Sequence, residues 1–278
     1  MRVALVQLTS TRDIDANVDT CRRLAAEARD TGAQWILFPE NAPFLGRDEE
    51  KLPVAEPLDG PMVDEFRTLA TDLDAWITLG SFPETSPDSD RTFNTQVHID
   101  PDGEIKGVYR KIHMFDVAVD DDVNFCESDS VHPGEEIVDT VVADGDDART
   151  VGMTICYDLR FPELYRRLQA RGADILTVPS AFTLKTGSVH WHALLKARAI
   201  ENQAFVLAPN QWGHHFGKRR SYGQSAIYDP WGRRLACAPD RQCFIVADLD
   251  FDHLTEIRNS MPVFNHRRVE RIDEPPGS

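Results

Sequence analysis

The chain has 278 residues and is 41% hydrophobic, so it is long enough to bury a substantial core in one large domain or two small ones. Its 46 acidic and 30 basic residues give a net charge of -16, which argues against nucleic acid or an anionic membrane as a partner because phosphate binding needs a basic face. No apolar run approaches the ~20 residues that span a bilayer, and the N-terminus lacks the apolar core of a signal peptide, so we expect a cytoplasmic protein.

Strand-like and helix-like segments alternate along the first part of the chain, which is typical of the α/β class. Apolar residues at helical spacing predict a helix over 15–31 and a second helix that begins at Pro61, a residue suited to the first position of a helix. Short apolar runs predict strands at 2–8, 35–38 and 76–82.

Two turn sequences predict hairpins and therefore mixed sheets. Pro-Asp-Gly at 101–103 joins the strands predicted at 92–99 and 104–109, and Asp-Pro-Trp-Gly at 229–232 joins 225–228 to 234–236. Because no Gly-x-Gly-x-x-Gly follows a strand, dinucleotide binding is not supported.

The remaining segments continue the alternation. We expect a long polar loop over 116–134 and a polar, flexible tail over 269–278. Between them, the same patterns predict strands at 151–156, 175–178, 204–208 and 243–249, and helices at 162–171 and 189–203.

A reactive side chain ends each of three apolar strands. Glu40 follows Ile36-Leu37-Phe38-Pro39, Lys111 follows Gly107-Val108-Tyr109-Arg110, and Cys156 follows Gly152-Met153-Thr154-Ile155. In α/β sheets ligands bind at the carboxyl ends of strands, so a carboxylate, an ammonium and a thiol could meet at one rim. Taken singly, each residue has an ordinary reading: a charge at a helix N-terminus, a surface lysine and a small buried residue.

Together these segments resemble the signature motifs of the nitrilase superfamily of carbon–nitrogen hydrolases. The matching phrases are Phe-Pro-Glu-Asn at 38–41, Tyr-Arg-Lys-Ile-His at 109–113 and Cys-Tyr-Asp-Leu-Arg-Phe-Pro-Glu at 156–163. The resemblance implies an α-β-β-α sandwich with two mixed sheets flanked by helices, in a single domain over 1–268.

Later segments narrow the resemblance to the Nit branch, which includes deaminated-glutathione amidases and omega-amidases. Both of these enzymes cleave the side-chain-type amide of a 2-oxo acid unit. The segments that carry this likeness are 179–183, 186–187, 190–191, 198–203, 221–225, 229–232 and 262–264.

The resemblance also implies the roles of the reactive residues. Cys156 would attack the amide carbonyl, and Glu40 would take the thiol proton and later protonate the departing ammonia. Lys111 and the backbone N–H of Tyr157 would hold the oxyanion. Glu127, which resembles the second glutamate of the branch, would hold Lys111 and position the substrate amine or the attacking water. The expected partners are therefore a small-molecule amide and water, with no metal or organic cofactor.

The substrate-binding side is less defined by the sequence. Arg160 could bind a substrate carboxylate through its planar fork, or it could form a structural ion pair with Asp158 or Glu163. Phe182 and Thr183 follow a strand end and could form the floor of the pocket. The cationic segment from His214 to Arg220, unusual in so acidic a chain, could steer an anionic substrate or contact another subunit.

Other functions remain open at this point. Within the superfamily, the alternatives are a nitrilase, a carbamoylase or an aliphatic amidase. A non-catalytic binding protein on the same fold would be expected to lack Cys156, Glu40 or Lys111. An amide synthase or acyl transferase would be expected to carry a fused synthetase domain or membrane segments.

Two further expectations come from composition. An acidic chain with only six lysines is typical of a halophile's protein surface, although an ordinary acidic mesophile protein is the alternative. Five cysteines at irregular spacing suggest free thiols and neither a zinc ribbon nor a disulfide framework. We also expect a homo-oligomer, a dimer or larger.

Overall fold

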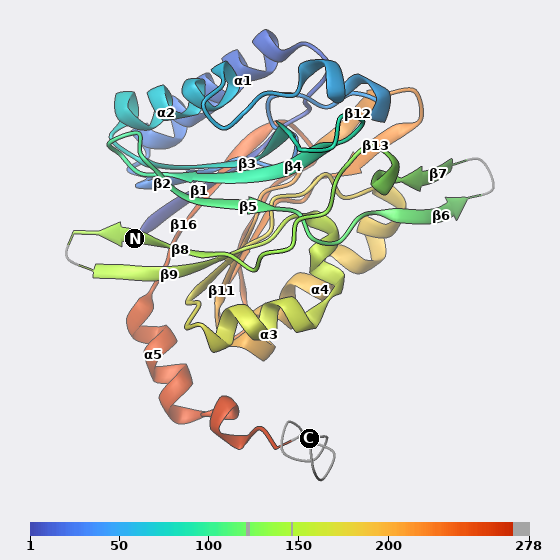
Figure 1. Cartoon of the computed structure of the whole chain (residues 1–278). Helices are drawn as coiled ribbons and strands as arrows, with labels where there is room; N and C mark the ends of the chain where they lie inside the picture. Colours follow the sequence, from blue (N-terminus) through green and yellow to red (C-terminus); the bar gives the residue numbers. More distant parts are fainter. Residues whose placement is uncertain (121–122, 146, 269–278) are drawn as a thin grey trace.

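The computed structural model describes residues 1–120, 123–145 and 147–268, and it stacks two β-sheets between two layers of helices (Figure 1). The first sheet mixes parallel pairs, such as β1 with β2, and antiparallel pairs, such as β3 with β4. Its strands lie in the order β16 (Cys243–Asp248), β1 (Arg2–Gln7), β2 (Trp35–Leu37), β3 (Trp76–Thr85), β4 (Thr92–Ile99) and β5 (Ile105–Arg110). The α/β sandwich expected from the sequence is confirmed.

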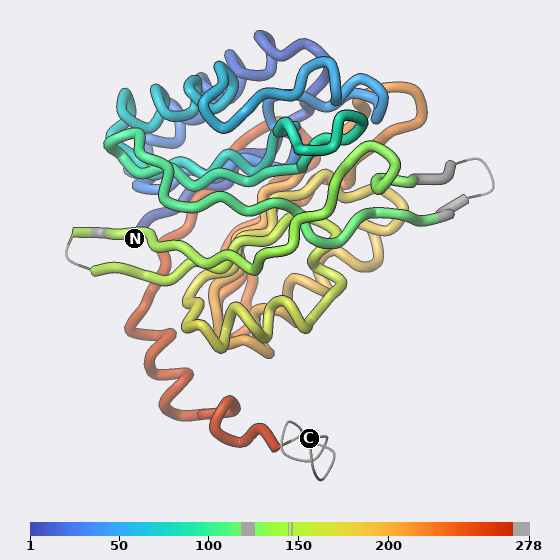
Figure 2. The backbone as a smooth tube through the Cα atoms, in the orientation of Figure 1, coloured from blue at the N-terminus to red at the C-terminus, as the bar shows by residue number. Residues whose placement is uncertain are grey.

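The second sheet is also mixed, because β9, β10 and β11 run parallel while the flanking strands are antiparallel. Its strands lie in the order β15 (Arg234–Cys237), β14 (Ala226–Tyr228), β11 (Phe205–Ala208), β10 (Ile175–Thr177), β9 (Asp147–Met153) and β8 (Asp139–Asp144). In both sheets, residues from distant parts of the chain become neighbours, as β1 and β16 do near the start and end of the tube (Figure 2).

Helices cover the outer face of each sheet. On the first sheet these are α1 (Ile14–Asp30) and α2 (Pro61–Leu73), and on the second they are α3 (Pro162–Ala170) and α4 (Leu184–Asn202) (Figure 1). The side chain of Asp13 caps α1 by accepting a hydrogen bond from the N–H of Ala16, and the apolar stripe of that helix is buried. Within the described residues, no helix combines the length and the apolar character needed to cross a membrane.

The core has three parts because each sheet has two faces to cover. Val3, Leu5, Trp35, Ile175 and Phe205 belong to the cluster between the sheets. Separate clusters lie beneath α1 and α2 and beneath α3 and α4. Strands buried on both faces explain the short, continuous apolar runs in the sequence.

Several sequence predictions need correction. The segment 116–134 is not a long loop: it contains the antiparallel pair β6 (Asp116–Asp120) and β7 (Val123–Cys126), followed by the short 3-10 helix η3 (Glu127–Asp129). The helix expected at 189 begins at Leu184 instead. The strand expected to reach Cys156 ends at Met153.

Some elements were missed altogether. They are β8, the hairpin of β12 (Trp212–Phe216) and β13 (Arg219–Tyr222), and α5 (Phe251–Ser260), which leads away from the sheets (Figure 1). The tail expected at 269–278 lies outside the described residues.

Candidate active site

Glu40 lies at the seam between the two sheets, just after β2. It is 3% exposed, and its carboxylate contacts both sides of the seam. Oε1 lies 3.0 Å from Nζ of Lys111, which follows β5 in the first sheet. Oε2 accepts a 2.7 Å hydrogen bond from the backbone N–H of Ala181, which follows β10 in the second sheet. The carboxylate is therefore fixed from both sheets.

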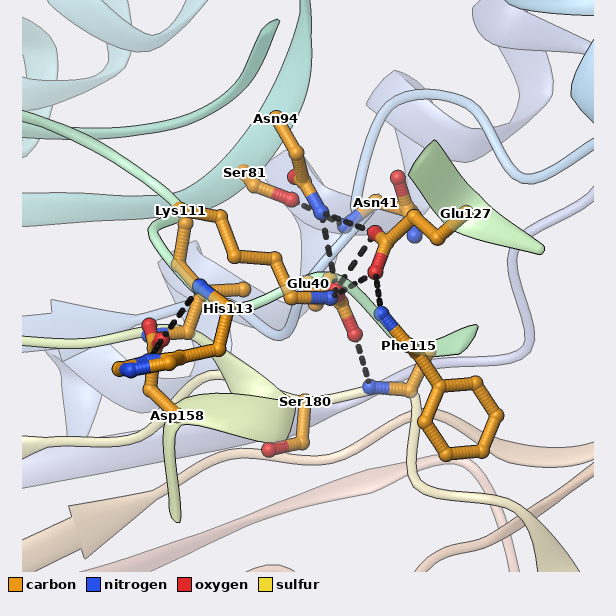
Figure 3. A network of polar contacts seen from close by, with 12 residues as sticks. Glu40, Asn41, Ser81, Asn94, Lys111, His113, Phe115, Glu127, Asp158 and Ser180 are labelled. Carbon is orange, nitrogen blue, oxygen red and sulfur yellow. Dashed lines mark hydrogen bonds and ion pairs between the residues drawn. The ribbon is translucent and has the colours of Figure 1, made fainter. Parts of the chain in front are cut away.

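Lys111 is a buried ammonium between two carboxylates (Figure 3). Its Nζ donates to Oε1 and Oε2 of Glu127 at 2.9 and 2.8 Å, in addition to Glu40. Burial alone would lower the pKa of Lys111, but the negative charges of Glu127 and Glu40 outweigh it and hold that pKa well above its usual value. Lys111 therefore stays protonated although it is only 2% exposed.

Glu127 completes this network from η3. Its Oε2 also accepts a 2.7 Å hydrogen bond from the backbone N–H of Phe115. Burial pushes the pKa of Glu127 up, yet the neighbouring Lys111, with a smaller effect from Lys51, brings it below its usual value. The pair is consequently a buried carboxylate and a buried ammonium that each keep the other charged.

Asn94, on β4, is a further member of the network that the sequence did not reveal. Its Nδ2 donates to Oε1 of Glu40 at 2.9 Å and to Oε1 of Glu127 at 3.4 Å. Its backbone carbonyl accepts from the N–H of Lys111 at 2.9 Å. The sequence alone does not mark this asparagine for such a role. Its role comes from its position near Lys111 in the β4–β5 hairpin, which only the pairing of the two strands shows.

Cys156 is the first residue of the 3-10 helix η4 (Cys156–Arg160), which follows β9. Its φ of 47° lies in the left-handed region, which a side chain normally avoids and which is often found where structure serves function. Its N–H donates to the carbonyl of Pro179 at 2.9 Å. Tyr157 follows in the first turn, where helix N–H groups have no acceptor within the helix.

The thiol of Cys156 is held in its neutral form. Burial raises its pKa well above the usual value, the charge of Glu40 raises it further, and Lys111 opposes them with a smaller effect. A neutral thiol is a poor nucleophile, so chemistry at this atom requires a base that removes its proton. Glu40 is the carboxylate that interacts with the thiol.

All the site residues predicted from the sequence line one cavity of about 410 Å³. They are Glu40, Lys111, Glu127, Cys156, Tyr157, Arg160, Phe182 and Thr183. The cavity also includes residues that the sequence did not indicate, notably Lys51, which forms a 2.7 Å ion pair with Asp48. Among the described residues, no group of three or more histidine, cysteine or acidic side chains is arranged to hold a metal.

Arg160 faces the cavity without a carboxylate partner in the described part of the chain. Its Nη1 lies 3.1 Å from Nδ1 of His190, and its guanidinium lies 5.7 and 5.3 Å from the ring centres of Tyr157 and Phe182. The ion pair with Asp158 or Glu163 that the sequence left open is not formed among the described residues. Asp158 instead accepts hydrogen bonds from Tyr109, His113 and Ile155.

The cationic segment 214–220 forms the β12–β13 hairpin and does not act as one patch. Lys218 and Arg219 line the cavity, and Nη2 of Arg219 donates to the carbonyl of Ala181 at 2.8 Å. His215 points elsewhere, towards Ser10 and Ser221, and burial lowers its pKa to about 4. His215 is therefore neutral near pH 7 and adds no charge to the cavity.

The sandwich fold and a cavity that brings together a thiol, two carboxylates and a lysine define a hydrolase of the nitrilase superfamily. Residues 2–259 match the carbon–nitrogen hydrolase family, and the chain belongs to that family. It is 41% identical over 272 residues to human (Homo sapiens) deaminated glutathione amidase. The match covers 96% of this chain and 82% of the human protein.

Solved structures agree with this assignment. NitFhit of Caenorhabditis elegans superposes with a TM-score of 0.88 at 36% identity; the match covers 97% of this chain and 65% of NitFhit. Nit3 of Saccharomyces cerevisiae, a member of branch 10 of the nitrilase superfamily, gives a TM-score of 0.84 at 29% identity over 95% of this chain and 94% of Nit3. The protein is an enzyme that hydrolyses amide C–N bonds.

Proposed function

We propose that this amidase uses Cys156 as nucleophile, Glu40 as general base and Lys111 as the cationic oxyanion donor. The observation that carries the proposal is the convergence of Cys156 with the Glu40–Lys111–Glu127 network in one cavity. Because the thiol is neutral, its proton must move to Glu40 as the sulfur attacks the amide carbonyl.

The tetrahedral intermediate carries an oxyanion, which Lys111 Nζ and the N–H of Tyr157 stabilise. One such donor is typically worth about 10²–10³ in rate. Protonated Glu40 then gives its proton to the nitrogen as the C–N bond breaks, which releases ammonia from a monoamide, or the free amine of a peptide substrate, and leaves a thioester on Cys156. Water loses a proton to Glu40, attacks the thioester and frees the carboxylic acid and the thiol.

Glu127 serves this cycle by holding Lys111 and orienting the substrate amine or the water. Its two contacts with Nζ leave the lysine little freedom to move. Since Glu40 and Lys111 lie 3.0 Å apart, loss of Glu127 would let Lys111 pair with Glu40 alone and reduce the basicity of that carboxylate.

For the substrate we propose a 2-oxo acid monoamide or a deaminated γ-glutamyl peptide. The human relative is a deaminated glutathione amidase. A molecule of this class carries at least one carboxylate besides the scissile amide, and burying a carboxylate requires a paired cation. Arg160 supplies that cation, because its nearest polar partner is the imidazole of His190 and not an acid.

A panel assay tests this substrate class, with turnover followed as ammonia for the monoamides and as free amine for the peptide-like substrates. We expect 2-oxoglutaramate or its peptide-like relatives to exceed butyramide in kcat/KM by at least ~10²-fold, the factor for about 2.7 kcal/mol of charge-assisted hydrogen bonding. Better turnover of neutral amides, nitriles or carbamoyl compounds would overturn the proposed substrate class.

The Arg160→Ala variant tests the residue. It should erase most of the preference for the anionic amide and leave alkylation of Cys156 intact, whereas Arg167→Ala, an exposed arginine on α3 outside the cavity, should change neither. An unchanged preference in Arg160→Ala would assign carboxylate binding to another cation of the cavity.

We further propose that residues 1–268 form one domain and that the protein assembles as a homo-oligomer in the cytoplasm of a halophile. Exposed apolar side chains along α4, namely Leu184, Val189 and Ile200, support a subunit contact. The net charge of -16 supports the halophilic assignment. Light scattering at several salt concentrations measures the size of the particle, and a monomer at all of them would contradict the oligomer.

A further inference from the structure

The site is assembled from both sheets, so its geometry depends on the contacts that fix the position of one sheet relative to the other. Lys111 follows β5 in the first sheet, whereas Cys156 follows β9 in the second. A reaction that needs the thiol and the ammonium on one carbonyl group therefore needs a fixed relation between two segments that belong to different sheets.

Asp158 joins these two segments directly. Its side chain is fully buried. Oδ2 accepts from the hydroxyl of Tyr109 at 2.7 Å and from the N–H of Ile155 at 2.9 Å. Oδ1 accepts from the backbone N–H of His113 at 3.1 Å and from its ring Nδ1 at 2.7 Å (Figure 3). Since a carboxylate only accepts, Nδ1 of His113 carries the proton.

The positions of these donors give the contact its meaning. Tyr109 and His113 stand two residues before and two residues after Lys111, and Ile155 stands directly before Cys156. We propose that Asp158 is a positioning residue that sets the nucleophile turn, with the N–H of Tyr157, against the segment that carries Lys111. This inference rests on the proposed function of Cys156 and Lys111.

Glu40 contacts Lys111, but it also has partners that do not involve Asp158. It has its own link across the seam, the 2.7 Å hydrogen bond from the N–H of Ala181, and Asn94 holds its other oxygen. Loss of the Asp158 contacts should therefore disturb the oxyanion donors and leave the general base beside the thiol. Activation of Cys156 and stabilisation of the oxyanion thus become separable by experiment.

Asp158→Asn is the diagnostic substitution. An amide replaces one acceptor oxygen with an NH₂ group, which must face either Tyr109 and Ile155 or the two donors of His113. The backbone N–H groups of Ile155 and His113 cannot turn away from it. Tyr109→Phe and His113→Phe are milder partners, since each removes one donor, and phenylalanine keeps the stacking of position 113 on Phe161, whose ring lies 3.7 Å away.

The experiment uses butyramide and butyraldehyde on the full-length protein. These probes share one acyl chain, are neutral and do not depend on the proposed substrate charge. Butyraldehyde adds reversibly to the Cys156 thiol: the thiol proton passes to Glu40, a C–S bond forms as the carbonyl π bond opens, and the carbonyl oxygen becomes an alkoxide-like centre at the oxyanion donors. Its inhibition constant therefore reports on those donors, whereas iodoacetamide alkylation of Cys156 reports on the thiol and its base.

For Asp158→Asn we expect kcat/KM for butyramide to fall by about 10² and the inhibition constant of butyraldehyde to rise by a similar factor, the size of one lost oxyanion donor. KM and the alkylation rate of Cys156 should stay within about twofold of wild type. The two phenylalanine variants should show the same pattern with smaller changes.

The control is Asp229→Asn. Asp229 is also buried and accepts from the backbone N–H groups of Trp231 and Arg233, but it lies in the turn between β14 and β15. It should lower stability without changing the ratio of aldehyde inhibition to alkylation. If Asp158→Asn lowers all readouts in parallel, or changes none, the positioning role is overturned. If Cys156→Ala still hydrolyses butyramide, the proposed function itself fails.

Discussion

Strand β4 carries a buried polar side chain near each of its ends, beside charged groups at one end and beside neutral groups at the other. At one end Asn94 contacts the charged carboxylates Glu40 and Glu127. Four residues further on, His98 places Nε2 3.2 Å from the carbonyl of Val141, and burial lowers its pKa to about 4. Alternate residues of a strand share a face, so these side chains meet the same interface.

Burial is nearly complete at both ends, so burial alone does not decide the charge state. Lys111 is 2% exposed and His98 is 1% exposed. Lys111 keeps its proton because two carboxylates contact it, whereas His98 meets a hydroxyl, a carbonyl and the indole rings of Trp35 and Trp76. The counter-charges keep the groups at the first end charged, and this is where we propose that protons are transferred. The neutral end serves stability.

The largest effect expected is the loss of turnover in Cys156→Ala. A methyl group cannot attack a carbonyl, and the small change in volume should leave the fold intact. Ammonia release should become unmeasurable while the melting curve stays close to that of wild type. Cys126→Ala and Cys243→Ala should remain active. A Cys156→Ala protein that kept a tenth of the activity would contradict the mechanism.

Glu40→Gln should come next, with a rate loss of at least ~10², the lower end of what a positioned acid–base group contributes. Glutamine preserves the shape but cannot accept the thiol proton. Alkylation of Cys156 at neutral pH, followed on its own peptide by mass spectrometry, should also slow. Glu84→Gln is the matched control, because Glu84 is a buried carboxylate that pairs with Arg110 outside the cavity. Equal alkylation rates in Glu40→Gln and wild type would mean that Glu40 does not activate the thiol.

The residues of the charged end could be predicted from the sequence because the ends of apolar strands can be recognised there. Glu40 and Lys111 follow β2 and β5, and the resemblance of the three motifs brought them together with Cys156. The backbone conformation of Cys156 was not predictable. Its left-handed φ is imposed by the turn into η4, and the local sequence shows no pattern for it. Asn94 was missed for a related reason, because its role depends on how β4 and β5 pair.

Elements whose stability comes from neighbours were also missed. The β6–β7 pair lies in a segment whose many aspartates led to the expectation of a loop, and pairing between its two strands supplies the order. Helix α5 buries Leu254 and Ile257, a stripe too short to stand out over ten residues. In both cases tertiary contacts outweigh local sequence preference.

His98, at the neutral end of β4, should lower the free energy of unfolding as the pH falls. The pKa of His98 is about 4 in the folded protein, below the usual value of 6.5, so the unfolded chain binds this proton more readily. Its contribution is fully present above pH 6.5 and is lost as pH falls towards 4. The loss is about 3 kcal/mol in the free energy of unfolding.

Denaturant melts between pH 7 and pH 4 measure this effect. His98→Gln should flatten the pH dependence, although His215, with a similarly lowered pKa, keeps part of it. His214→Gln, at an exposed position, should not. An unchanged slope in His98→Gln would mean that this imidazole is protonated in the folded state.

The smallest effect should be that of salt, which separates surface charge from the buried charges at the site. A net charge of -16 implies self-repulsion at the surface, and salt screens exposed charges within a Debye length that shrinks from about 10 Å at 0.1 M to about 3 Å at 1 M. Tm should therefore rise by a few degrees between low and molar potassium chloride. Most of that rise should fall below 1 M, because screening saturates while the exclusion effects of salt continue to grow.

The Lys111–Glu127 pair, 2.8 Å apart and buried, should be screened far less. The pH dependence of Cys156 alkylation should accordingly stay fixed over the salt range in which Tm moves. A constant Tm would favour an ordinary acidic protein over a halophilic one. A pH profile that shifted with salt would show that ions reach the carboxylates of the site. The charges beside Asn94 would then respond to salt as exposed charges do, and their burial would not distinguish them from the surface.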